Sequence, residues 1–155
     1  MLKHPKNKII TKWFLIAGGF LLVAGAAIYL YYYYATLTYE DTATVKAEFN
    51  VAALPFIKEF EKDHKTANIK YAEKIIAVTG IITATETADT SINIKMADTT
   101  TGSYLIFAFQ KQHLDEAKML KAADLVTIKG SCSDGIYSEI LGAYFISFKR
   151  CVLVK

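Results

Sequence analysis

The chain contains few of the side chains that metal and redox sites use. Its 155 residues include two cysteines and three histidines, and the histidines, His4, His64 and His113, are widely separated. Structural zinc sites need four cysteine or histidine ligands in closely spaced pairs. No Walker phosphate loop and no GxGxxG dinucleotide motif is present either. We therefore expect neither a metal site nor a bound cofactor.

Signals of catalysis are also lacking. Neither His64 nor His113 lies in a recognisable nucleophile motif. The neighbouring carboxylates occur among lysines in segments with a helical pattern, and solvated helix faces account for them; these are Glu59, Glu61, Asp63, Asp115 and Glu116. We expect that the protein is not an enzyme.

The most informative feature present is a long apolar run near the N-terminus. Residues 13–34, WFLIAGGFLLVAGAAIYLYYYY, contain no charge and no proline. A helix of 22 residues is about 33 Å long, enough to cross a hydrocarbon core of about 30 Å. The run predicts a transmembrane helix.

A cleavable signal peptide is the alternative interpretation of this run. The small residues 24–27 resemble a cleavage site, and the start of the chain is basic. The apolar stretch of a signal peptide is only about 7 to 15 residues long, whereas this run continues to Tyr34. No cysteine precedes Cys132, so a lipoprotein-type acceptor is also missing.

The flanks of the run predict its orientation. The tail, residues 1–12, has four lysines and no acid, and residues 35–43 carry only Glu40 and Asp41. Lysines are retained on the cytoplasmic side, so the tail is predicted to be cytoplasmic and the C-terminal part extracytoplasmic. Trp13 and the tyrosines 31–34 suit the two headgroup regions.

The excess of basic residues in the whole chain comes from the tail, so it is evidence for the membrane orientation. The chain has 18 basic and 15 acidic residues, and four of the basic residues lie in the tail. The remaining 14 basic residues face all 15 acidic ones, which gives the exported part a formal charge of −1. Nucleic-acid binding usually needs a concentrated basic surface, so this balance does not favour it.

A helical lead is expected between the membrane and the main domain. Residues 35–50 are polar and predict a stalk. Residues 51–72 have a helical pattern, with Leu54, Ile57 and Phe60 on one face. Pro55 suits a first turn, and Asp63 is placed to cap a second short helix.

Residues 73–155 have the pattern of strands. The expected elements are a strand over 74–85 bent at Gly80, strands over 91–97 and 104–109, a helix over 112–122, a strand over 125–132, a turn at Asp134 and Gly135, and a strand within 143–154. Three strands, a helix and two strands are the order of a five-stranded OB-fold barrel. A general α+β sheet is the alternative. The predicted fold is thus mainly β with helices: a transmembrane helix, a helical lead and an OB barrel.

Four short motifs occur in a characteristic order. They are A-x-x-x-Y at 67–71, KIIAVTG at 74–80, DLVTIKGSC at 124–132 and CVLV at 151–154. In order and spacing they resemble the tRNA_anti-like OB-fold family of bacterial envelope proteins, over about the last 90 to 100 residues. The resemblance implies an OB barrel without an assigned activity, often lipid-anchored. The apolar span replaces the acylated cysteine here, so anchoring is interpreted from the residues alone.

OB barrels generally bind ligands on their second and third strands. The corresponding candidates here are Asn93, Lys95, Tyr104 and Ile106, although an ordinary polar outer face explains the same four residues. The strand SINIKMA has no aromatic residue, and Phe107 and Phe109 are expected in the core. Binding of nucleic acid is therefore considered unlikely.

Cys132 and Cys151 fall in strands that are neighbours in an OB barrel. A disulfide between them would close a loop of about 20 residues, worth about 3 kcal/mol in the loop-entropy model. Two buried free thiols are the alternative.

These patterns favour a binding module of the bacterial envelope, held in the inner membrane by one span and exposed to the periplasm or cell exterior. Its partner would be an envelope protein or a small ligand. A membrane-tethered nucleic-acid-binding OB domain is the second hypothesis, and a structural subunit assembled through its span is the third.

Overall fold

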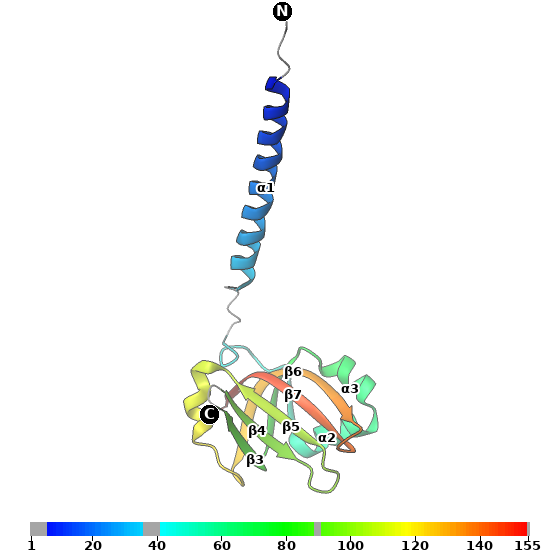
Figure 1. The fold of residues 1–155 in the computed structure, drawn as a ribbon. Coiled ribbons are helices and arrows are strands. Elements are labelled where there is room, and N and C mark those ends of the chain that lie inside the picture. Colours follow the sequence, from blue (N-terminus) through cyan, green and yellow to red (C-terminus); the bar gives the residue numbers. More distant parts are fainter. Residues whose placement is uncertain (1–5, 36–40, 89–90, 155) are drawn as a thin grey trace, which may run out of the picture. The chain divides into compact units, whose positions relative to one another are not determined.

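The computed structural model describes the backbone of residues 6–35, 41–88 and 91–154. Side chains are described for these residues except 6–18, 20, 35 and 88. The chain divides into two units, residues 1–39 and residues 40–155 (Figure 1).

The first unit contains one helix, α1 (Lys6–Ala35), which confirms that the predicted span 13–34 is helical. No proline interrupts these 30 residues. Residues 1–5 of the predicted tail, and the side chains at 13–18 and 20, lie outside the described part. Within that part, no helix is both long and apolar enough for a membrane crossing.

The second unit is a seven-stranded sheet with four short helices (Figure 1). Its strands are β1 (Phe49–Ala52), β2 (Ile75–Ile81), β3 (Ala84–Ala88), β4 (Ser91–Ala97), β5 (Tyr104–Phe109), β6 (Leu125–Ser138) and β7 (Ala143–Leu153). The helices are α2 (Ala53–Lys62), α3 (His64–Tyr71), η1 (Lys111–His113) and α4 (Leu114–Lys118). The strand order is β1-β2-β6-β7-β5-β4-β3, with β1–β2 and β5–β7 parallel.

The domain is mainly β with helices, as predicted, but its sheet has seven strands where five were predicted. The added strand is β1, and the predicted first strand is divided into β2 and β3. Only Ile82 and Thr83 join these halves, but β2 pairs with β6 and β3 pairs with β4. The N–H of Ile82 donates to Asp124 O (2.9 Å), and the N–H of Thr83 donates to Lys95 O (2.8 Å). The segment thus changes partner within one step, and the sheet returns on itself as in an OB barrel.

The bend lies two residues later than predicted. Gly80 belongs to regular β2, and a Cβ there would lie 2.6 Å from Ala53 Cβ and 2.8 Å from Met96 Sδ. The role of this glycine is therefore to permit the close approach of α2 to the sheet, and the predicted bend at Gly80 is wrong. The chain turns inward at Ile82, which is buried.

The helical lead begins later than predicted, because residues 49–52 form β1. Asp63 caps α3 as expected: its Oδ1 accepts the N–H groups of Lys65 (3.2 Å) and Thr66 (3.1 Å). The predicted apolar face of α2 was partly wrong. Phe56 is buried with Ile57 and Phe60, whereas Leu54 is exposed.

Residues 41–50, predicted as a stalk, lie against the barrel. Lys129 Nζ donates to Ala43 O (3.0 Å) and Val45 O (2.8 Å). Thr42 is buried, and its N–H donates to Gln110 Oε1 (3.3 Å). Residues 36–40 lie outside the described part.

The core lies between the sheet and α2. Inward positions of β4 and β5 alternate as predicted: Ile92, Ile94, Met96, Leu105, Phe107 and Phe109 are buried. Phe148 of β7 stacks on Phe107 at 4.8 Å between centroids and contacts Phe56 at 5.9 Å. This packing leaves the alternate residues of β4, β5 and β7 on the outer face.

The turn predicted at Asp134 and Gly135 is wrong, because β6 continues to Ser138. Gly135 pairs with Ile146, and its N–H and C=O bond the side-chain amide of Asn68 at 2.7 and 2.9 Å. A Cβ at Gly135 would lie 2.3 Å from the ring of Phe60. Glycine here allows β6 to pass directly under α2.

We expect Gly135→Ala to lower the free energy of unfolding by about 1–3 kcal/mol, because the added methyl overlaps Phe60. Urea denaturation followed by circular dichroism measures the change. Lys65→Ala, at an exposed site on α3, is the control and should change stability little. Equal stability of both variants would contradict the described packing.

Candidate functional site

The four predicted binding residues lie together on the outer face of the barrel. Lys95 of β4 pairs with Ile106 of β5, and Asn93 and Tyr104 occupy alternate positions of the same strands. All four are half-buried. The structure thus confirms that they share a face, while ligand binding by them stays a prediction.

Tyr104 and Phe145 form the centre of this face. Tyr104 pairs with Phe145 across the parallel β5–β7 ladder, and the two rings stack with centroids 6.2 Å apart and an interplanar angle of 22°. Lys95 Nζ lies 5.0 Å from the centroid of Tyr104. A cation at this distance is attracted by the negative face of an aromatic ring. We call Lys95, Tyr104 and Phe145 the aromatic face.

Sequence reasoning missed Phe145. The signal was present in the alternation AYFISF, in which Ile146 and Phe148 point inward and Phe145 and Ser147 outward. What the sequence did not contain was the register that places Phe145 beside Tyr104. That register joins strands separated by about 40 residues.

Acidic groups border the aromatic face. Lys95 Nζ forms an ion pair with Glu86 of β3. On the other side, Ser147 Oγ donates to Asp134 Oδ1 at 3.3 Å. Ile136 lies across from Phe145 on β6 and is 45% exposed. The face is therefore an apolar, ring-bearing surface with one paired cation and not a concentrated basic patch.

Four of the five carboxylates set aside in the sequence have structural partners. The exception is Glu61, whose Oε1 is buried without a hydrogen-bond partner among the described residues. Glu59 accepts hydrogen bonds from Lys70 Nζ (2.7 Å) and Tyr71 OH (2.8 Å). Burial raises the pKa of Glu59, but these two donors outweigh burial and hold the pKa below its usual value. Asp115 pairs with Lys118 at 2.7 Å. The contacts of Glu59 join α2 to α3, whereas the Asp115–Lys118 pair lies within α4.

His113 contacts Asp41, at the start of the segment that packs against the barrel. Its Nε2 lies 2.9 Å from Asp41 Oδ1, and its Nδ1 lies 3.6 Å from Glu116 Oε2. The N–H of Ala43 and then His113 keep the pKa of Asp41 below its ordinary value. Among the side chains that the structure describes, no group of three His, Cys, Asp or Glu residues is arranged to hold a metal ion.

Cys132 and Cys151 are buried free thiols, the second of the two alternatives. They lie on adjacent strands, but Cys132 pairs with Phe148, whereas Cys151 lies beside Gly130. A bulge between Lys129 and Ser131 produces this offset. Burial raises the pKa of Cys132 to about 12 and also raises that of Cys151.

Comparisons with known proteins agree with the fold. The tRNA_anti-like family model matches residues 2–141. The solved structure of a "putative nucleic acid-binding lipoprotein" from Klebsiella pneumoniae is 18% identical, with a TM-score of 0.53 over 68% of this chain and 91% of that one. No curated protein matches the chain.

Two further solved structures contain a similar domain. OBody AM3L09, bound to hen egg-white lysozyme, is 13% identical with a TM-score of 0.43, over 56% of this chain and 86% of its own. A putative aspartyl-tRNA synthetase from Leishmania major is 9% identical with a TM-score of 0.45, over 77% of this chain and 22% of its own.

We expect both thiols to resist iodoacetamide in the folded protein at pH 8, because thiolate is the reactive form and the pKa values are raised. In denaturant without reductant, both should be alkylated, and intact mass measures the number of adducts. A disulfide would instead give no adduct until reductant is added, which would contradict the free thiols.

Proposed function

Since the chain belongs to the tRNA_anti-like family, we propose that it is a membrane-anchored OB module of the bacterial envelope that binds its ligand on the aromatic face. The observation that carries this proposal is the Tyr104–Phe145 stack with Lys95 beside it. The role is binding, without catalysis.

The chemistry of the face supports a ligand with a flat ring or an extended apolar edge. Tyr104 and Phe145 are only half-buried, so a ring-bearing ligand gains dispersion and apolar burial against both. OB barrels generally use this region, their second and third strands, for binding. The face lies on paired strands, so its rings are held in place before binding.

Anchoring is supported by the sequence of residues 13–34, by their helical backbone and by the four lysines before them. A short connection, residues 36–40, joins this helix to the segment held on the barrel. The anchor confines the barrel near the bilayer and raises its effective concentration toward other membrane-attached molecules.

Single-stranded nucleic acid is a second candidate ligand for the same face. A specific observation favours it: Lys95 lies beside a stacked pair of rings, the combination that such ligands use. The similar Klebsiella protein is itself named for nucleic acid binding. The acidic border of the face and the charge of −1 in the exported part weigh against a strong electrostatic contribution.

A photo-crosslinking amino acid at Ile106, beside the aromatic face, tests the binding module in native membranes. We expect a discrete adduct whose yield falls severalfold with Tyr104→Ala. The same probe at Ile69, which is 87% exposed on α3, is the control and should give no such adduct. Equal adducts from both positions, or release of the chain from membranes by a carbonate wash, would contradict the proposal.

Fluorescence anisotropy with a labelled oligothymidylate tests the second candidate. If it holds, Tyr104→Ala and Phe145→Ala should each weaken binding by about 1–3 kcal/mol, the usual contribution of one stacked base. Tyr137→Ala is the matched control, because Tyr137 neighbours Ile136 and points to the opposite side of β6. Absence of binding at low salt would reject nucleic acid and leave the binding module intact.

A further inference from the structure

An apolar pocket lies where the start of α2 meets β2 and β4, and its lining extends to Ala97, the cross-strand partner of Tyr104. Its volume is about 400 Å³, and its walls include Leu54, Pro55, Gly80, Ile81 and Met96. Gly80 lies between Ala53 and Met96, which pack too closely to leave room for a side chain there.

The polar groups of the pocket already have partners. Thr79 Oγ1 is hydrogen-bonded to Thr127 Oγ1 at 2.8 Å, and Thr83 Oγ1 donates to Lys95 O at 3.1 Å. An occupant therefore gains most from apolar contact and needs no hydrogen-bonding group.

Exposed aliphatic side chains surround the opening. Leu54 is 49% exposed and Ile81 58% exposed. Leu125, 72% exposed, pairs with Ile81 across the β2–β6 ladder, so the two side chains lie on the same side of the sheet. Pocket and rim form one continuous apolar surface.

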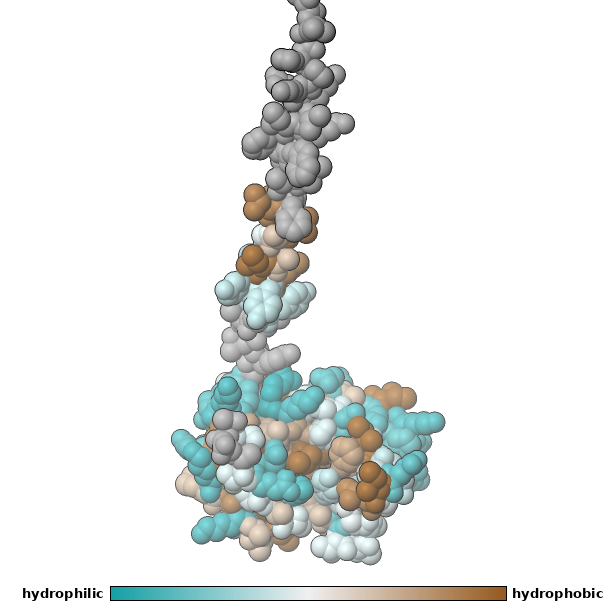
Figure 2. All heavy atoms as spheres, in the orientation of Figure 1, coloured by the Kyte–Doolittle hydropathy of each residue, from teal (hydrophilic) through white to brown (hydrophobic). Residues whose placement is uncertain are grey.

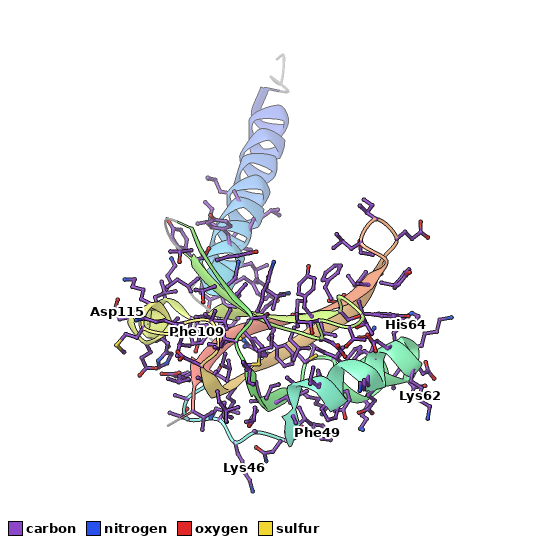
Figure 3. The ribbon with its side chains drawn as sticks, turned by 90° about the horizontal axis from the view of Figure 1, so that it is seen from below. Lys46, Phe49, Lys62, His64, Phe109 and Asp115 are labelled. Carbon is purple, nitrogen blue, oxygen red and sulfur yellow. The ribbon has the colours of Figure 1, made fainter. Side chains whose placement is uncertain are left out.

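The same chain carries a protruding apolar tip at the β6–β7 hairpin. Ile140 is 95% exposed and Leu141 62% exposed. The hairpin projects from the body of the sheet in Figure 3, and hydrophobic side chains gather at its end in Figure 2. The turn is well defined, because Gly142 N–H donates to Ser138 O at 2.8 Å.

Charges beside the two features are complementary. Lys58 follows Leu54 by one helical turn, at the pocket, and Glu139 precedes Ile140 at the tip. Within the described part of the chain, neither Lys58 nor Glu139 has an ion-pair partner within 4.0 Å, although the charge of Lys58 helps to lower the pKa of Asp98. A tip entering a pocket would bring these opposite charges close together.

From this complementarity we infer that the β6–β7 tip of one copy inserts Ile140 and Leu141 into the α2–β2–β4 pocket of a second copy. One tip in one pocket buries less surface than the roughly 1,200–2,000 Å² of a stable interface. The contact is therefore weak in dilute solution and is populated where the copies are concentrated, as on a membrane.

Thiol crosslinking of the full-length chain in membrane vesicles tests this contact. Leu54→Cys and Ile140→Cys are made in separately tagged copies, which are mixed and treated with a short bismaleimide. The two native thiols are buried, so we expect them not to react. We expect a crosslink between positions 54 and 140 only when both variants are present.

Ile69→Cys replaces Ile140→Cys as the control, since Ile69 is 87% exposed but lies on α3. Each of three outcomes would overturn the inference. They are a crosslink to position 69 at equal yield, a crosslink only between two copies of position 140, and no crosslink at all. Tyr104→Ala should abolish ligand binding and leave the 54–140 crosslink unchanged. The two readouts therefore distinguish failure of this inference from failure of the proposed function.

Charge reversal gives a second, independent arm. Glu139→Lys and Lys58→Glu should each reduce the 54–140 crosslink by about two- to fivefold, the usual range for an exposed ion pair, and the double reversal should restore it. Because both sites are exposed, these changes are expected to leave the fold intact. Equal yields in all four backgrounds would overturn the pairing of tip and pocket.

Discussion

The change of hydrogen-bond partner at Ile82 and Thr83 is the constraint on which the rest of the barrel depends. Across these two residues the chain passes from β2, which pairs with β6, to β3, which pairs with β4. Because the N–H groups of both residues remain bonded across the bend, the turn carries no cost of unpaired backbone groups. Both ends of the strand order are thus joined through one short segment, and the direct pairing of β4 with β5 and of β5 with β7 forms one continuous outer face.

The sequence predicted those parts of the fold that depend on the local spacing of apolar and capping residues. Alternation in β4 and β5 identified the inward residues, and Asp63 marked the start of α3. Predictions failed where contacts distant in sequence decide the structure. Asp134 and Gly135 form a favourable turn pair, but the space that Gly135 leaves for Phe60 keeps β6 extended.

The same distinction applies to the candidate site. Tyr104 was identified from its own strand, whereas Phe145 gains its importance only from the parallel β5–β7 register, which residue spacing does not encode. Helical spacing predicted that Leu54 is part of the core, but Phe56 is buried instead and Leu54 is exposed. The exposure of Leu54 is what leaves an apolar pocket at the start of α2.

The charges around the aromatic face bear on which ligands it would select under the proposed function. Lys95 is held between Glu86 and the ring of Tyr104, so a phosphate that recruits this lysine must compete with a carboxylate already in place. A ring that stacks on Tyr104 and Phe145 displaces only water and leaves the ion pair intact. Under the proposed function, discrimination at this face would rest on ring surface more than on charge, which favours ligands whose affinity changes little with salt concentration.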